Sequence, residues 1–574
     1  MGRRTEILLF AAALAAYGWF HQGGGWSQNA RFAMVRAVVE RGTVSVDDFL
    51  IYRASPGGRL SRVPVSDGTF ERDGRRVALA WERGLRVTGE GVDAGSVPVR
   101  AVAVSGDLVF ARGRFHPNKA PGAALAAVPA YALVHLAERT LGIDPDSPGA
   151  LAVGAWLTGL LSVGLLAALG VVLFHRIARE YTPDRPSTAL LATLAFAFGT
   201  MYFPYATMLF EHDVVAACLV IAFYGIRKAR SAGPAWAVLA GAAAGWAAIT
   251  NYVTAVVVAV LAVYLVATHR ERRAWAGYAA GALGPFLAIC AYNAACFGTP
   301  FTTNYAAQNP LFQTAGSWLG VFVAPDPKVL LAVTFSPFRG LFVSSPVLLV
   351  GPVGLWIMLR DRRLRADGWV CAAIVAFYLL FTMSFNAWQG GNGVGPRYLV
   401  PAVPFLCLAL PLAITRLPRL TAGLAAISIA LTVLVTAVDA QAPVVDVPGR
   451  PLWKASPVTE YVLPLFVSGR ADPLLDAVVE ATARRTGEDA RALRERVVRG
   501  DAAGLPLALV HGPVSANPIG MYEAWFFTSF PPGSPEAAGN SFNAGEMIFP
   551  ESRLSLLPLL LFEGALAWMI LRRG

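Results

Sequence analysis

The sequence predicts an all-α polytopic membrane protein with about twelve transmembrane helices, a large first outer loop, and a C-terminal outer segment before the last helix. Of its 574 residues, 55% are hydrophobic and 15% charged, whereas soluble domains carry about 25% charged residues. The mean hydropathy is +0.52. Apolar runs of membrane length cover residues 6–22, 149–174, 187–205, 212–226, 234–249, 251–267, 274–292, 340–359, 367–385, 398–414, 420–438 and 553–571.

Lysine and arginine residues cluster in alternate connections between these runs. With Arg3 and Arg4 placed inside, the short outer turns hold only Arg397. Short loops rich in Lys and Arg resist translocation, so both termini are predicted to be cytoplasmic in a bacterial inner (plasma) membrane. The net charge of +11 is thus interpreted as topology and attraction to anionic lipids, not nucleic-acid binding. The inner clusters hold Arg176, Arg179, Arg185, Arg227, Lys228, Arg230, Arg270, Arg272, Arg273, Arg360, Arg362, Arg363, Arg365, Arg416, Arg419, Arg572 and Arg573.

This topology divides the chain into five parts. The first run follows a basic pair as in a signal peptide, but its small-residue sites lie inside the run, so we expect an uncleaved helix. Outer loops of this length are usually functional or carry their own structure. The parts are 1–22 (first transmembrane helix), 23–148 (first outer loop), 149–438 (transmembrane bundle with outer loop 293–339), 439–552 (outer segment) and 553–574 (last helix and cytoplasmic end).

The first outer loop is predicted to contain an interfacial helix and small β hairpins. Ser27 is a candidate N-cap for a helix whose apolar face would lie in lipid, with Arg36 and Glu40 paired at i, i+4. Strands should follow between Thr43 and Phe115, with residues 105–107 as a turn and 108–115 as the returning strand. The apolar run 123–136 is short for a span, so we expect an outer interfacial or re-entrant helix.

In the C-terminal outer segment, Asp472-Pro473 can start a helix that runs through Arg499 and stops at Gly500. Its many charges are interpreted as a solvated face.

Cysteines and cofactor motifs point to no prosthetic group. The five cysteines lie in or beside apolar runs without metal-ligand spacing, which favours packing over disulfides or zinc. No phosphate-binding loop, dinucleotide fingerprint or metal pair is present. We therefore expect no metal ligands and no evident cofactor; a divalent metal stays open but has no recognisable ligand set.

Polar residues from separate parts of the chain should converge on the outer face. Glu211, His212 and Asp213 stand at the outer end of a predicted span, where ionisable groups are costly unless used or hydrated. One carboxylate could act as a general base; the alternative is a solvated helix N-terminus favoured by the helix dipole. Lys119 and Arg397, beside Gly- and Pro-rich turns, could grip a phosphate or could be snorkelling interface residues.

Further candidates are less specific. Trp388, before four closely spaced glycines, could be a sugar-stacking platform or an aromatic-belt residue. Asp47 and Asp48 are candidate acids that could equally cap a turn. The middles of the spans hold few ionisable groups, which favours surface chemistry over ion-coupled transport.

In this order and on this face, the residues resemble GT-C class membrane glycosyltransferases. The likeness is greatest to the protein O-mannosyltransferase and lipid A aminoarabinose transferase branch, in an uncharacterised bacterial subgroup. The stretch 118–122 is similar to the family's Lys-Pro-Pro-Leu stretch, and 397–401 to an Arg-Tyr-x-x-Pro opening of a later span. Asp213 resembles the acid at the second outer loop. The subgroup features are Tyr292-Asn293, Phe297-Gly298-Thr299-Pro300 and Phe335-Ser336-Pro337-Phe338-Arg339-Gly340.

The resemblance implies transfer of a sugar from a polyprenyl-phosphate carrier to a lipid, glycan or protein acceptor at the outer face of the membrane, with an acidic base. The family expects an acid just after the first span, but this chain has Gln28 and Asn29 there. Asp213 is therefore the expected base, with Asp47, Asp48 or Glu211 as alternatives. The expected substrate-binding residues are Asn29, Arg31, His116, Lys119, His212, Trp388, Arg397 and Tyr398, with Lys119 and Arg397 on the carrier phosphate and Asn29 on the acceptor.

Two other functions stay open on the sequence. One is a non-catalytic lipid-linked glycan binder or flippase of the same fold, which the missing acid favours. The other is a polytopic transporter.

Overall fold

The computed structural model describes residues 2–22, 25–54, 60–72, 75–81, 85–88, 102–103, 107–307, 312–442, 444, 447, 449–468, 472–498, 542–549 and 553–571. The predicted strand alternation at 97–101, the turn residues 105–106 and the helix stop at 499–500 lie outside these residues.

Long helices form one bundle, and every segment predicted to span contains helix. By length and composition, five helices of the described chain can cross a membrane, or six if one bent pair counts as a span. A multi-pass helical membrane protein is thus confirmed, while about twelve spans stays a prediction. The main helices are α1 Arg3–Trp19, α4 Pro148–Gly159, α5 Leu165–Tyr181, α6 Pro186–Phe198, α8 Glu211–Ala232, α9 Ala235–Thr250, α10 Ala255–Thr268, α11 Arg272–Phe297, α14 Gly351–Arg360, α15 Arg365–Met383, α16 Val403–Cys407, α17 Leu410–Arg416, α18 Pro418–Val438 and α23 Leu557–Leu571.

Short segments interrupt several of the predicted spans. The segment 397–416 bends by 57° between α16 and α17, where Pro411 cannot donate a backbone hydrogen bond. The segment 187–205 breaks after α6 at Gly199. The short segments in the bundle are η3 Leu160–Gly164, α7 Tyr202–Ala206, η4 Tyr252–Thr254, α13 Leu341–Ser344, η7 Pro346–Val350, η8 Arg397–Ala402 and η13 Arg553–Leu556.

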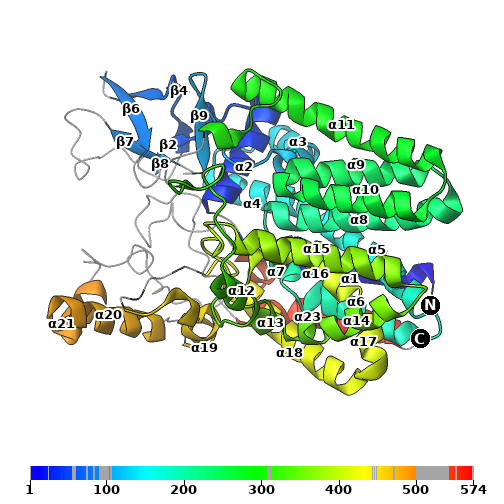
Figure 1. Cartoon of the computed structure of the whole chain (residues 1–574). Coiled ribbons are helices and arrows are strands. Elements are labelled where there is room, and N and C mark those ends of the chain that lie inside the picture. Colours follow the sequence, from blue (N-terminus) through cyan, green and yellow to red (C-terminus); the bar gives the residue numbers. More distant parts are fainter. Residues whose placement is uncertain are drawn as a thin grey trace.

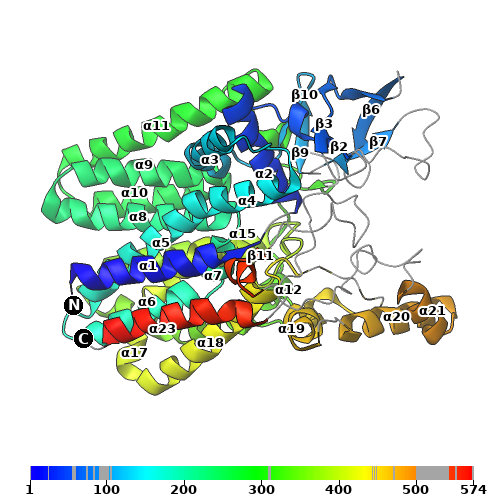
Figure 2. The ribbon, with the colours of Figure 1, turned by 180° about the vertical axis from the view of Figure 1, so that it is seen from behind.

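The start of α1 and the end of α23 lie together at one end of the bundle, and the strands lie at the other (Figures 1 and 2). We call the end with the strands and α2 the outer end. Small residues let the helices approach closely: a Cβ added at Gly241 on α9 would lie 1.9 Å from the Tyr278 carbonyl oxygen of α11. Such contacts drive helix association where lipid supplies no hydrophobic force.

The first outer loop carries small antiparallel sheets, with β3-β2-β8 and β4-β5-β6-β7 as strand orders. The predicted single strand 108–115 is instead a hairpin of β9 and β10, because Arg112 (φ 54°) and Gly113 (φ 76°) form a tight two-residue turn. The strands are β2 Ile51–Ala54, β3 Leu60–Arg62, β4 Val65–Ser66, β5 Thr69–Arg72, β6 Arg75–Trp81, β7 Leu85–Thr88, β8 Val102–Ala103, β9 Leu108–Ala111 and β10 Arg114–Pro117.

Helix α2 (Trp26–Arg36, continued by η1 Ala37–Arg41) differs from the predicted interfacial helix. It begins at Trp26 after Gly25 (φ 77°), so Ser27 lies inside the helix and is not its cap. Residues 27–36 are all buried, so α2 is enclosed by protein and no face of it lies in lipid. Its neighbour α3 (Gly122–Leu141) packs against α2, α4 and α9 and is longer than the predicted 123–136.

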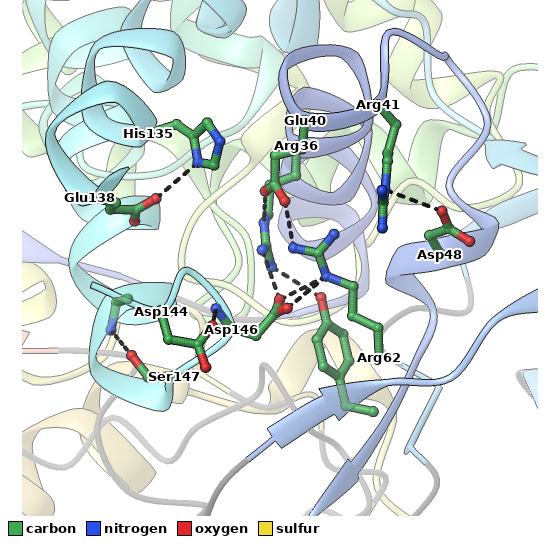
Figure 3. Close-up of polar contacts among 12 residues, drawn as sticks. Arg36, Glu40, Arg41, Asp48, Arg62, His135, Glu138, Asp144, Asp146 and Ser147 are labelled. Carbon is green, nitrogen blue, oxygen red and sulfur yellow. Dashed lines mark hydrogen bonds and ion pairs between the residues drawn. The ribbon is translucent and has the colours of Figure 1, made fainter. Parts of the chain in front are cut away.

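An ion network fixes α2 and η1 to the strands (Figure 3). Arg36 bonds Glu40 at 2.7 Å, which confirms the predicted i, i+4 pair, and it reaches Asp146 at 2.8 Å. Arg62 of β3 contacts both carboxylates, Glu40 at 2.5 Å and Asp146 at 2.8 Å. Nearby cations lower the pKa of the buried Glu40 carboxyl despite its burial. Two arginines and two acids satisfy one another, so α2, η1, β3 and the segment just before α4 are held together within the first outer loop.

In the C-terminal outer segment, two helices occupy the place of the single predicted helix 472–499. α20 (Asp472–Thr486) ends at Gly487 (φ 76°), and α21 (Ala490–Val498) starts after Asp489, whose carboxylate accepts from the Ala492 N–H. Before them lie η9 Leu452–Lys454, η10 Val458–Val462 and α19 Leu463–Ser468.

A two-residue strand pair, which the sequence does not predict, joins the end of α1 to the chain before α23. β1 (Phe20–His21) pairs with β11 (Phe542–Asn543), and η12 Ala544–Met547 follows.

Candidate functional site

An ion pair at the outer end of α8 forms the centre of the candidate site. Glu211 is the first residue of α8, and its Oε2 accepts a hydrogen bond from Nη2 of Arg31 on α2. Arg31 is 1% exposed and also donates to the Ser27 carbonyl at 3.1 Å. Because water is excluded, each charge depends on the other. The pair therefore ties α2 to α8 and fixes the Glu211 carboxylate.

Arg397, the first residue of η8, lies beside this pair. Its guanidinium is 5.1 Å from the ring centre of Tyr398 and 5.7 Å from that of Phe210, and the Arg31 guanidinium lies 5.8 Å from the same Phe210 ring. Arg397 Nη2 donates to the Tyr398 hydroxyl at 3.2 Å. Within the described chain, Arg397 has no carboxylate at ion-pair distance, and its buried Nε has no hydrogen-bond partner. A guanidinium held between rings without a counter-ion is suited to bind an anion.

Lys119 comes from the turn between β10 and α3. Its Nζ lies 3.5 Å from Asp107 Oδ2 and 5.6 Å from the centre of the Phe312 ring. Asn118 Nδ2 also donates to Asp107, at 3.4 Å, and the backbone carbonyl of Asn118 accepts from the Asn304 side chain in η5 (Asn304–Ala307). The lysine side chain is 27% exposed, so it can still reach a ligand.

These groups form one electrostatic cluster. Arg31, His212, Arg397 and Lys119 all act electrostatically on the Glu211 carboxylate. Glu211 offsets Arg31, and Asp107 offsets Lys119, so among the described residues of this cluster Arg397 is left without a counter-ion. The cluster can bind an anion next to a fixed carboxylate.

His212 and Asp213 follow Glu211 but face differently. The His212 ring meets Tyr398 edge-on at 5.7 Å and Tyr205 at 5.5 Å, so it packs in the aromatic wall of the site. Asp213 has 0% exposure, and neither of its carboxylate oxygens has a partner among the described residues. Asp213 is therefore more enclosed than its neighbour Glu211, which is 9% exposed.

Arg339 holds the glycine-rich loop that precedes Arg397. It donates to the carbonyls of Gln389 (2.8 Å), Gly391 (2.6 Å) and Gly393. Gly390, Gly391 and Gly395 have φ between 65° and 75°, where side chains are strained. Burial lowers the pKa of Arg339 to about 10. This arginine therefore acts as a clamp that positions Arg397.

The candidate acids of the first outer loop lie away from the cluster. Asp47 accepts from Ser45 Oγ at 2.5 Å and from the Phe115 N–H at 2.8 Å, and burial raises the pKa of its carboxyl. Its carboxylate therefore joins the segment before β2 to β10, which is a long-range tie and not the turn cap that the sequence also allowed. Asp48 pairs at 3.4 Å with Arg41, both at least 43% exposed (Figure 3).

The structure places three further residues that were predicted to bind substrate. His116 Nδ1 lies 3.2 Å from the Val44 carbonyl oxygen, and burial lowers the pKa of its imidazole. Asn29 is 2% exposed on α2, two residues before Arg31. Trp388 packs edge-on against Phe338 at 6.2 Å.

Asp107 is a site residue that sequence reasoning assigned only to a turn. Its position before the stretch 116–119 was the available signal, but only the β9–β10 hairpin brings it back to Lys119. Gln28 stands after α1 where the family expects an acid. Its side-chain amide donates to the Gln22 carbonyl at 2.6 Å and accepts from the Leu209 N–H at 2.8 Å.

Residues 150–297, from α4 to the end of α11, match the family model described as dolichyl-phosphate-mannose-protein mannosyltransferase. This match confirms the resemblance of the chain to membrane glycosyltransferases of the GT-C class. The segment contains Glu211, whereas Arg31, Lys119 and Arg397 lie outside it.

Among solved structures, the chain is similar to a crystal structure of ArnT from Cupriavidus metallidurans bound to undecaprenyl phosphate. The sequences are 16% identical, the similarity covers 88% of this chain and 75% of that chain, and the TM-score is 0.44. No curated protein matches the chain.

Proposed function

We propose that the protein is a glycosyltransferase that takes a sugar from a polyprenyl-phosphate carrier. The observation that carries the proposal is the pairing of a surplus cation, Arg397, with a fixed carboxylate, Glu211, at the outer end of the bundle. The match of residues 150–297 to a family of mannosyltransferases that use a dolichyl-phosphate donor supports the same class of reaction.

In this proposal the carrier phosphate binds between Arg397 and Lys119. When the sugar C1–phosphate bond breaks, the leaving phosphate gains negative charge, and two cations beside it lower the energy of that transition state. Arg397 offers a planar fork for two phosphate oxygens, and Lys119 offers a point charge. Tyr398, His212 and Phe210 enclose the headgroup, while Arg339 keeps the loop before Arg397 in place.

Glu211 serves as the base. An acceptor hydroxyl attacks C1 and passes its proton to Glu211 as the new C–O bond forms. The Arg31 ion pair occupies Oε2 and leaves Oε1, 4.0 Å from His212 Nε2, to receive the proton. This role replaces the one expected for the buried Asp213; Asn29, on the same helix as Arg31, is kept as an acceptor-positioning residue.

The acceptor is a lipid, glycan or protein hydroxyl at the outer face of a bacterial inner membrane, with both chain termini cytoplasmic. The bias of Lys and Arg toward one set of connections supports this orientation.

One observation favours a second function. Gln28 fills the place of the usual acid with two backbone contacts, and Glu211 is tied to Arg31. A chain without a working base would bind or move the lipid-linked glycan without transferring it.

Native mass spectrometry of the detergent-purified protein with undecaprenyl phosphate tests the proposal. Lys119→Ala and Arg397→Ala should each weaken lipid retention about 10- to 100-fold, the loss of one charge-assisted contact. Arg360→Ala is the matched control, since that arginine also stacks on an aromatic ring, Trp356, but on α14. If neither Lys119→Ala nor Arg397→Ala weakens lipid retention, the proposal is contradicted. Sugar transfer from a panel of labelled polyprenyl-phosphate donors separates the enzyme from the binder.

A further inference from the structure

A row of aromatic rings leads from the surface to Arg397. Trp318 contacts Phe322 at 5.3 Å between ring centres, Phe322 contacts Phe381 at 6.2 Å and Phe385 at 6.5 Å, and these two meet Tyr398 at 6.1 and 5.2 Å. We call Trp318, Phe322, Phe381, Phe385 and Tyr398 the aromatic ladder. Its inner rung, Tyr398, lies under the Arg397 guanidinium at 5.1 Å.

Backbone hydrogen bonds hold the outer rungs in place. The Val323 N–H donates to the Ser384 carbonyl at 2.8 Å, and the Asn386 N–H donates to the Val321 carbonyl at 3.0 Å. The Asn386 amide also bonds Thr314 Oγ1 at 2.8 Å. The loop that carries Trp318 and Phe322 is therefore attached to the end of α15, and the ladder is a fixed surface.

The ladder stays accessible along its length. Trp318 is 70% exposed at the tip of a tight turn in which Leu319 has φ 52° and is itself 59% exposed. The other four rungs are each only partly buried. A turn that holds a strained leucine and an exposed tryptophan at its tip places apolar surface outward, where lipid can contact it.

The chemistry of the rungs selects an apolar chain. The four outer rungs carry no carboxylate, amide or cation, and only the indole N–H of Trp318 and the hydroxyl of Tyr398 at the two ends can hydrogen-bond. A sugar needs several hydrogen-bonding groups and stacks on one ring, whereas an isoprenoid chain offers successive apolar units to successive rings. At the inner end of the ladder, the uncharged rings are followed directly by the cation Arg397. This arrangement suits an amphiphile with an apolar chain and an anionic head.

We propose that the aromatic ladder binds the isoprenoid chain of the carrier lipid, with Trp318 toward the bilayer and Tyr398 at the phosphate. This inference rests on the proposed function and adds the tail site to it. Phe312, on the same loop as Trp318 and Phe322, lies under Lys119. The loop therefore contacts Lys119 through Phe312, and the ladder contacts Arg397 through Tyr398.

Binding of two lipids of different chain length tests the ladder. Undecaprenyl phosphate and geranyl phosphate share the phosphate, but only the long chain can follow all five rings. Trp318→Ala and Phe322→Ala should weaken undecaprenyl phosphate at least fivefold and change geranyl phosphate less than twofold. Trp369→Ala and Phe286→Ala, exposed aromatic residues on α15 and α11, are the matched controls and should change neither.

The outcomes separate the two proposals. Equal weakening of both lipids, or of neither, overturns the ladder. Trp318 is largely exposed, so its loss does not disturb the core, and a Trp318→Ala protein without the chain-length effect overturns the ladder even if Phe322→Ala fails to fold. If the ladder variants weaken binding of undecaprenyl phosphate but Arg397→Ala does not, the tail site stands and the assignment of Arg397 to the phosphate fails. If the wild-type protein retains neither lipid, both fail.

Discussion

Removing Arg31 should destabilise the protein through the charge it leaves behind on Glu211. The two side chains are 1% and 12% exposed. Loss of one partner of a buried ion pair costs about 3–5 kcal/mol, and the residual exposure of Glu211 favours the lower end, about 3 kcal/mol. Arg31→Met should therefore lower the free energy of unfolding by this amount, and Glu211→Met should do much the same.

The double variant distinguishes a coupled pair from two separate contacts. Arg31→Met with Glu211→Met removes both charges, so the total cost should fall to about 1 kcal/mol or less. Equilibrium unfolding by SDS titration in detergent micelles, followed by tryptophan fluorescence, measures all four corners of the cycle. The exposed pair Arg176 and Glu6, 40% and 22% exposed, is the control, with a coupling of about 0–1 kcal/mol.

Additive effects of Arg31→Met and Glu211→Met, within about 0.5 kcal/mol, would refute this reasoning. They would mean that the two charges are solvated separately and that Glu211 is not fixed by Arg31.

Three further predictions concern Arg339, which positions the site, and three acids outside the cluster. Burial raises the pKa of Asp439 to about 6, so its neutral form is favoured by folding; stability should fall as pH rises from about 4 to 6, and Asp439→Asn should flatten that slope in thermal unfolding. Asp47→Ala should cost about 1–2 kcal/mol because it leaves the Phe115 N–H unpaired, whereas Asp48→Ala, in an exposed pair, should change thermal stability by about 0.5 kcal/mol or less. Arg339→Ala should weaken undecaprenyl phosphate binding about tenfold by releasing the glycine-rich loop, as measured by native mass spectrometry; Arg339→Ala binding equal to wild type would show that the loop holds Arg397 by itself.

Local sequence patterns correctly predicted the features that depend on residues close together in the chain. The apolar runs found helix in every predicted span, and the i, i+4 spacing found the Arg36–Glu40 pair. The patterns were less accurate where a single residue controls the backbone, as at Gly113, which folds one predicted strand into a hairpin, and Gly487, which divides one predicted helix.

Contacts between distant parts of the chain could not be read from the sequence. Arg31 and Glu211 are 180 residues apart, and nothing in either segment indicates that the other is its partner. Helix α2 was expected to lie along the membrane interface with its apolar face in lipid, but Arg31 and Arg36 find partners in other segments and the helix is buried. Asp107 and Lys119, although close in sequence, meet only because the β9–β10 hairpin returns the chain.

The most direct test compares Glu211→Gln with Asp213→Asn in two assays, retention of undecaprenyl phosphate and transfer of labelled sugar from polyprenyl-phosphate donors. In Glu211→Gln the new amide would still accept a hydrogen bond from Arg31 but could not take a proton. We predict that Glu211→Gln keeps lipid binding within about twofold and lowers transfer by about 10²–10⁴-fold, while Asp213→Asn retains transfer. Unchanged transfer in Glu211→Gln, or its loss only in Asp213→Asn, would contradict the assignment of Glu211 as the base.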